Sequence, residues 1–226
     1  MLKDQEISIS MVLITHYHGD HTGGVPDLLA RSPHTKVYKN TPDAGQLDIK
    51  DGQEFAVEGA NLRAVFTPGH AFDHMCFVLE EENALFTGDN ILGHSVNTVI
   101  ENIGLFMKSL VNMQDQSCDK GYPGHGDVIA KLPRILSICL QQKRRRELKI
   151  LDALAELKRQ DEGFGWTMKR ETVTVQKLVT MVHGNIIGEM RDGVLEPMTE
   201  EILVKLSGEG KVGYELKEGV KKWFLC

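Results

Sequence analysis

The sequence has few cysteines and no long apolar run. Only four cysteines occur in 226 residues, and no two of them form a CxxC pair. Such a low density argues against a disulfide framework and favours reduced thiols in the cytoplasm. No apolar run reaches the roughly 18 residues of a membrane span, and the first six residues lack the apolar segment of a signal peptide. We therefore expect a cytoplasmic protein without a membrane partner.

Basic residues are scarce in the first two thirds of the chain. Residues 1–142 contain 10 Lys and Arg against 18 Asp and Glu, whereas residues 143–226 contain 16 against 14. An acidic larger part lacks the broad cationic surface that nucleic acid phosphates attract, so nucleic acid ranks low among the expected partners. With 41% hydrophobic and 26% charged residues, the chain can form a core, which excludes wholesale disorder.

Hydrophobic patterning predicts strands followed by helices in the larger, acidic part. Apolar runs or alternation predict strands over residues 7–14, 36–38, 54–57, 62–66, 75–79 and 84–87. Helical spacing covers residues 25–30 and 99–112, and Pro133 begins another helix. This order predicts a layered α/β domain over residues 1–142.

The sequence pattern changes from about Lys143. Helical patterns cover residues 148–157, 174–183 and 200–206, and two short strands follow at 212–216 and 222–224. Three helices and a hairpin predict a winged-helix-like domain over residues 143–226.

Histidine and aspartate concentrate where the predicted strands end. Residues 15–24 read THYHGDHTGG, and TPGH at 67–70 and TGD at 87–89 come at the ends of predicted strands. YPGHG at 122–126 is expected to follow one more strand. Histidine is the most common metal ligand in proteins, and loops at one edge of a sheet can bring such side chains to a shared ion. These motifs therefore predict a metal site.

The motifs HxHxDH, PGH, GD and PGHG, in that order, resemble those of the metallo-β-lactamase-fold hydrolases over residues 11–142. The resemblance implies an αββα sandwich that binds two divalent ions, with zinc as first choice and manganese or iron as alternatives. It also implies a catalytic role for Asp20, which would orient the attacking hydroxide. The ligands that it implies are His16, His18 and His70 for one ion, Asp20, His21 and His125 for the other, and Asp89 as the bridge.

Finer motifs within residues 36–94 resemble the fungal lactamase-like thioesterases that release aromatic polyketides from an acyl carrier protein. They are also similar, less closely, to the lactamase-like endoribonuclease, and both groups have a winged-helix-like C-terminal domain. The resemblance thus implies a thioesterase whose substrate is a carrier-bound thioester. A metal-dependent endoribonuclease on single-stranded RNA is the alternative, and a lactoylglutathione thioesterase and a β-lactamase also share the motif set.

The resembled families carry two or three strands before HxHxDH, whereas 15 residues precede His16 here. We therefore expect a sandwich that lacks its first N-terminal strands, with the apolar strand over residues 7–14 at an open edge. Such an edge favours self-association, so a homo-oligomer is expected. A third hypothesis follows, in which the chain is a truncated, partner-dependent member without activity alone.

Two further histidines lie beside the motifs. His74 follows PGH, where it would either orient a ligand or act as an ordinary hydrogen-bonded residue of the fold. His94 lies just beyond Asp89, where it would either contact substrate or form a turn.

Overall fold

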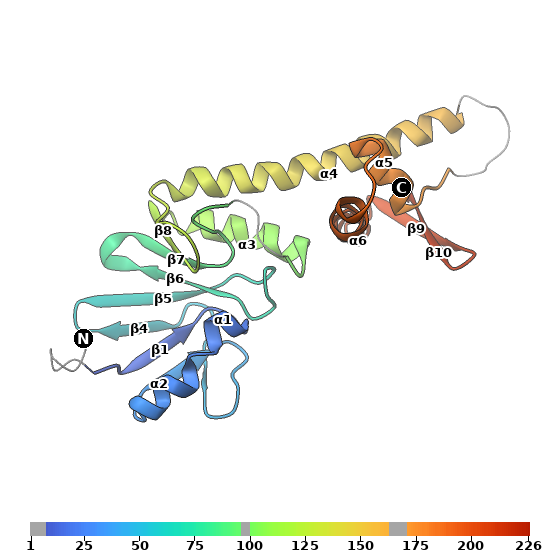
Figure 1. The fold of residues 1–226 in the computed structure, drawn as a ribbon. Helices are drawn as coiled ribbons and strands as arrows, with labels where there is room; N and C mark the ends of the chain where they lie inside the picture. The colour runs from blue at the N-terminus through green and yellow to red at the C-terminus, as the bar shows by residue number, and fades with distance from the viewer. Residues whose placement is uncertain (1–7, 96–99, 163–170) are drawn as a thin grey trace. The chain divides into compact units, whose positions relative to one another are not determined.

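The computed structural model describes residues 8–95, 100–162 and 171–226, which form two compact units (Figure 1). The first unit is Met1–Leu140 and the second is Gln141–Cys226. The boundary expected after residue 142 lies close to this division. Of the predicted elements, only residue 7 of the first strand and residue 99 of one helix lie outside the described residues.

A three-stranded parallel sheet begins the first unit. Its order is β1 (Met11–Ile14), β2 (Lys36–Lys39) and β3 (Leu47–Asp48). Two short helices, α1 (Gly19–Thr22) and α2 (Val25–Arg31), connect β1 to β2, and Pro26 lies in the first turn of α2. Among the described residues, β1 has a strand neighbour on one side only.

A five-stranded sheet follows. It contains β4 (Glu54–Val57), β5 (Ala60–Phe66), β6 (Met75–Leu79), β7 (Ala84–Gly88) and β8 (Lys120–Pro123), in that spatial order. Pairing is antiparallel from β4 to β7, and β8 runs parallel to β7. The expected hairpin of β6 and β7 is confirmed: a 3₁₀ turn over Glu80–Glu82 ends at Asn83, whose φ of 46° allows the tight reversal.

Apolar side chains from both sheets form one core. Ile49, Phe55, Ala64, Met75 and Phe77 are buried together, with Met11, Leu13, Tyr38 and Leu62 packed against them. Helix α3 (Ile103–Asp115) buries one apolar face, which includes Phe106 and Leu110, and lies with the start of α4 alongside the five-stranded sheet (Figure 1). The predicted layered α/β organisation is confirmed.

The sequence pattern suggested one helix from Pro133 and a separate one after Lys143, and here the structure differs. A single helix, α4 (Leu132–Glu162), runs through both. No Gly or Pro occurs from residue 134 to residue 162, so the chain has no local reason to break there. In the part of the chain that the structure describes, no helix is both long and apolar enough to cross a bilayer.

The second unit follows the predicted order of helices and hairpin. It continues from α4 with α5 (Val175–His183), a π-helical turn (Met190–Leu195), α6 (Glu196–Gly208) and the antiparallel strands β9 (Val212–Lys217) and β10 (Val220–Leu225). The Thr174 side chain caps α5 by accepting a hydrogen bond from the Lys177 amide. Buried Leu154, Leu178, Leu203 and Trp223 contribute to the core of this unit.

Candidate metal centre

All candidate ligands of the first unit lie at or just beyond the C-terminal ends of strands. The first histidine pair follows β1, the next two ligands lie in α1, and the remaining three follow β5, β7 and β8. Strands of a rigid sheet hold such loops in fixed relation, which is how protein metal sites are commonly positioned. These residues are, in chain order, His16, His18, Asp20, His21, His70, Asp89 and His125.

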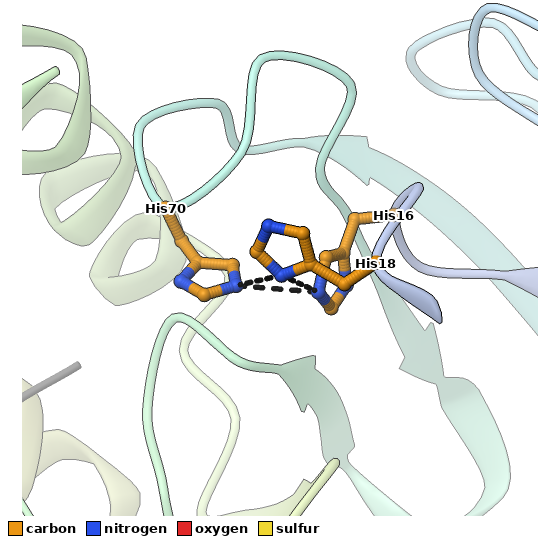
Figure 2. A group of neighbouring side chains, drawn as sticks. All are labelled: His16, His18 and His70. Carbon is orange, nitrogen blue, oxygen red and sulfur yellow. Dashed lines mark hydrogen bonds between the residues drawn. The ribbon is translucent and has the colours of Figure 1, made fainter. Parts of the chain in front are cut away.

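Three histidines form the first group (Figure 2). His16 Nε2 lies 2.9 Å from His18 Nδ1, and His70 Nε2 lies 3.2 Å from the former and 3.1 Å from the latter. Ligands in a tetrahedral zinc site, about 2.0–2.1 Å from the ion, lie about 3.3 Å from one another. The triangle of nitrogens therefore has nearly the size that one ion requires.

The ring of His16 is oriented and kept neutral. Its Nδ1 lies 3.0 Å from Thr15 Oγ1, which leaves Nε2 for the triangle. Burial, followed by the neighbouring His21, His70 and His18, lowers the pKa of His16 from 6.5 to about 3. A neutral imidazole is the form that binds a metal ion.

The second group combines two histidines with two carboxylates. One ligand atom from each of Asp20, His21, Asp89 and His125 lies within 4.8 Å of all the others. His125 Nε2 is 2.9 Å from Asp20 Oδ2, and His21 Nε2 is 3.4 Å from Asp89 Oδ1. His21 Nε2 and Asp89 Oδ1 are both buried without a hydrogen-bond partner among the described residues. A divalent cation would satisfy both, so the donor set fits one.

Asp89 lies between the two groups. Its Oδ2 is 3.9 Å from His70 Nε2 in the first group and 3.5 Å from His125 Nε2 in the second. The residue is only 8% exposed. A carboxylate in this position can serve an ion on either side.

His74 holds the Asp89 loop. The Asp89 amide donates a hydrogen bond to His74 Nε2 at 3.1 Å, and His74 Nδ1 lies 3.0 Å from Thr67 Oγ1. Complete burial, followed by the nearby His16, lowers the pKa of His74 well below 6.5. A neutral ring can accept the amide hydrogen on Nε2. His74 therefore contacts the backbone of the loop that carries Asp89.

Two glycines of the motifs are required by close approach. A Cβ on Gly124 would lie 2.3 Å from Asp89 Oδ1, and a Cβ on Gly88 would lie 2.5 Å from His74 Nε2. Gly88 also has a φ of +47°, a conformation that favours glycine. The glycines of GD and PGHG therefore leave space for the Asp89 carboxylate and for its support.

A buried ion pair lies behind the loop that carries His16 and His18, and the sequence alone does not predict this pair. Lys39 Nζ lies 3.1 Å from Asp73 Oδ2, and both side chains are buried. Asp73 Oδ1 accepts a hydrogen bond from the Tyr17 amide at 3.2 Å, between His16 and His18. Lys39 Nζ also donates to the Thr41 carbonyl at 2.6 Å. The pair thus connects the end of β2 to both loops of the histidine triangle.

His94 lies outside the two ligand groups that the described residues form. It lines a cavity of about 780 Å³ together with Leu92, Ile129, Lys131 and Arg134. The neighbouring Gly93 amide donates to the His125 carbonyl at 2.8 Å, so this cavity borders the loop that carries His125.

Comparison with known proteins agrees with this geometry. The family model described as "Metallo-beta-lactamase superfamily" matches residues 2–44. An atrochrysone carboxyl ACP thioesterase from Aspergillus chevalieri is 50% identical over 227 residues, covering 100% of this chain and 71% of the relative. A lactamase-like protein from Aspergillus niger is 48% identical over 225 residues, covering 99% of this chain and 70% of the relative.

Two solved structures share the fold. A β-lactamase domain protein from Burkholderia ambifaria aligns with a TM-score of 0.73 at 14% identity, covering 100% of this chain and 77% of that chain. A metallo-β-lactamase family protein from Thermus thermophilus aligns with a TM-score of 0.66 at 22% identity, covering 100% and 83%.

The clustered histidines and aspartates at the strand ends of a two-sheet α/β unit are suited to metal binding, and the similarity to thioesterase-named relatives over the full chain identifies the protein as a hydrolase. The clusters indicate divalent metal ions as the cofactor. The chain belongs to the metallo-β-lactamase superfamily.

Proposed function

We propose that this protein is a dinuclear metal-dependent thioesterase that hydrolyses an aromatic polyketide thioester on an acyl carrier protein. The observation that carries the proposal is the 50% identity, over the whole chain, to a relative named as an ACP thioesterase. The two converging ligand groups support it, because they provide what a metal hydrolase requires. The substrate and the carrier protein partner are both part of the proposal.

We propose His16, His18 and His70 as ligands of one ion and Asp20, His21 and His125 as ligands of the other. Asp89 would bridge them, as its 3.9 Å and 3.5 Å distances to the two groups suggest. Zinc is the first choice because imidazole dominates the donor set, with manganese and iron as alternatives because carboxylates contribute.

The chemistry divides between the ions and the side chains. Two bound divalent ions lower the pKa of water and polarise a carbonyl. Asp20 is proposed as the catalytic carboxylate that accepts a hydrogen bond from the attacking water and orients it, since its side chain is 57% exposed at the site. The thiol that leaves has a pKa of about 8.5, so it departs as thiolate without a strong general acid. This matches a site in which His74 is neutral and already hydrogen bonded.

His94 is proposed as a substrate contact. It lines the 780 Å³ cavity beside the His125 loop, and that cavity has apolar walls with Lys131 and Arg134 among its lining residues. A carrier-bound substrate reaches the active site on a long phosphorylated arm, for which apolar walls with nearby cations are suitable.

The proposal also covers the two domains, the edge of the first sheet and the location of the protein. Residues 143–226 would form a winged-helix-like domain, following the order of helices and hairpin, and residues 1–142 the catalytic domain. Among the described residues β1 pairs on one side only, and this edge would promote self-association. Four free cysteines agree with a cytoplasmic location, which stays a prediction. A partner-dependent member without activity alone is the opposing hypothesis.

A single-stranded RNA endonuclease is the second candidate. The observation that favours it is a cavity of about 180 Å³ in the second unit whose lining includes Arg145, Arg146, Lys149 and His183. Phosphate binding requires such cations. The acidic balance of residues 1–142, which carry every proposed metal ligand, ranks this function below the thioesterase.

Turnover of three substrates by one zinc-loaded preparation tests the proposal. We expect chelator-sensitive hydrolysis of an aromatic acyl-thioester on a carrier protein, little or no cleavage of an RNA oligomer, and none of a β-lactam. Replacing His18 by alanine should abolish the thioesterase reaction, because one of the three proposed histidine ligands of the first ion is lost. Replacing the exposed His34 by alanine provides the matched control and should leave the rate unchanged. Efficient chelator-sensitive RNA cleavage without thioester turnover would promote the nuclease instead.

A further inference from the structure

Two aromatic side chains form an exposed pair at the histidine triangle. The rings of Tyr17 and Phe72 stack with centroids 5.2 Å apart and an interplanar angle of 27°. Tyr17 is 40% exposed and Phe72 is 55% exposed. Large aromatic rings gain stability from burial, so a stacked pair left this accessible requires an explanation.

The pair belongs to the same loops as the first group of ligands. Tyr17 lies between His16 and His18 in the chain, and its ring meets that of His18 edge to face with centroids 4.7 Å apart. Phe72 follows His70 by two residues in the loop between β5 and β6. The pair therefore lies next to the histidine triangle.

Hydrogen bonds fix the Tyr17 end of the pair. The Tyr17 hydroxyl donates to Glu101 Oε1 at 2.6 Å, and the Tyr17 amide donates to Asp73 Oδ1 at 3.2 Å. The Glu101 amide in turn donates to the Gly69 carbonyl at 2.7 Å, in the loop of His70 and Phe72. Tyr17 is thus anchored at its backbone and at its hydroxyl, and a ring fixed before binding loses little conformational entropy when a ligand stacks on it.

We propose that the Tyr17–Phe72 pair is the surface that binds the flat aromatic acyl part of the substrate and selects it over short aliphatic acyl groups. The inference rests on the proposed thioesterase function and deepens it by naming the specificity determinant. An aromatic acyl group can extend the stack in an offset or edge-to-face arrangement, which an acetyl group cannot do. Phe72 makes the larger contribution, because it is the more exposed ring.

Equilibrium binding to the zinc-loaded full chain tests this inference without relying on turnover. The probes are 2-naphthoyl-pantetheine and acetyl-pantetheine analogues in which a methylene group replaces the thioester sulfur. Phe72→Ala is expected to weaken naphthoyl binding about tenfold and to leave acetyl binding within about twofold. Phe66→Ala is the matched control, because Phe66 is a partly exposed phenylalanine at the end of β5, and it should change neither affinity.

Two further variants separate stacking from folding. Phe72→Leu keeps an apolar side chain without a flat ring and should lose naphthoyl affinity selectively, by about threefold to fivefold. Tyr17→Phe keeps the ring and removes only the hydrogen bond to Glu101, so naphthoyl affinity should fall less than in Phe72→Ala. Zinc content is measured for each variant and should equal that of the wild type.

The outcomes distinguish this inference from the proposed function. Equal affinities of wild type and Phe72→Ala for the naphthoyl probe, or an equal loss for both probes, would overturn the aromatic surface. A wild-type protein that hydrolyses no thioester would overturn the proposed function, whereas the ratio of the two probe affinities would still decide whether the pair selects aromatic groups.

Discussion

Replacing Asp89 by alanine is expected to lower the metal content from about two equivalents to below one and to reduce thioester hydrolysis by about 10³-fold or more. The reason is position: the Asp89 carboxylate lies within 4 Å of ligand nitrogens in both groups. Loss of any other proposed ligand affects one ion, whereas loss of Asp89 removes the carboxylate proposed to bridge the two. Elemental analysis after zinc loading and dialysis gives the metal content, and turnover is measured on the same samples.

Asp115→Ala is the matched control for this experiment. Asp115 is an exposed carboxylate at the end of α3, outside both ligand groups. We expect this variant to keep the wild-type metal content and rate. An Asp89→Ala protein that retained full metal occupancy would show that the bridging assignment is wrong.

Replacing Lys39 by methionine is expected to lower the free energy of unfolding by about 3–5 kcal/mol. Methionine fills the space of the lysine stem but leaves the Asp73 carboxylate buried without the cation that lies 3.1 Å away. A loss of this size is a large fraction of the total stability of a typical domain. Urea denaturation followed by circular dichroism measures it.

Two variants make the result specific. Lys36→Met removes an exposed lysine from the same strand and should change stability by no more than about 0.5 kcal/mol. Adding Asp73→Asn to Lys39→Met removes the uncompensated charge and should recover part of the loss, because an amide oxygen can still accept from the Tyr17 amide. Equal stabilities of the Lys39→Met and Lys36→Met proteins would contradict the structural role of the pair.

The strands that precede the candidate metal ligands could be predicted because their apolar patterns are local in the sequence. The apolar run of residues 11–14 forms a strand, and the two strands around Glu80–Glu82 form the predicted hairpin. His16, His70 and Asp89 each come soon after such a strand. The structure brings the motif residues that follow these strands into two groups.

Features that depend on distant contacts could not be predicted in the same way. Lys39 and Asp73 are separated by 34 positions, and nothing in their local sequence indicates that two charged side chains are buried together. The contact of His74 with the Asp89 amide likewise forms only when two hairpin strands pair. The change in composition near Lys143 suggests a break between two helices, but no Gly or Pro lies there to end a helix, and α4 continues through it.

Titration of zinc into metal-free protein tests the central claim, a dinuclear metal-dependent thioesterase, most directly. Hydrolysis of 2-naphthoyl-pantetheine is followed at each ratio of metal to protein, with magnesium as the control ion because it favours oxygen ligands over imidazole. We expect negligible turnover without metal and a rate that rises with zinc until it levels off at about two equivalents. A metal-free protein that hydrolyses the thioester at the full rate, or a zinc-saturated protein that does not hydrolyse it at all, would show that the protein is not a metal-dependent thioesterase.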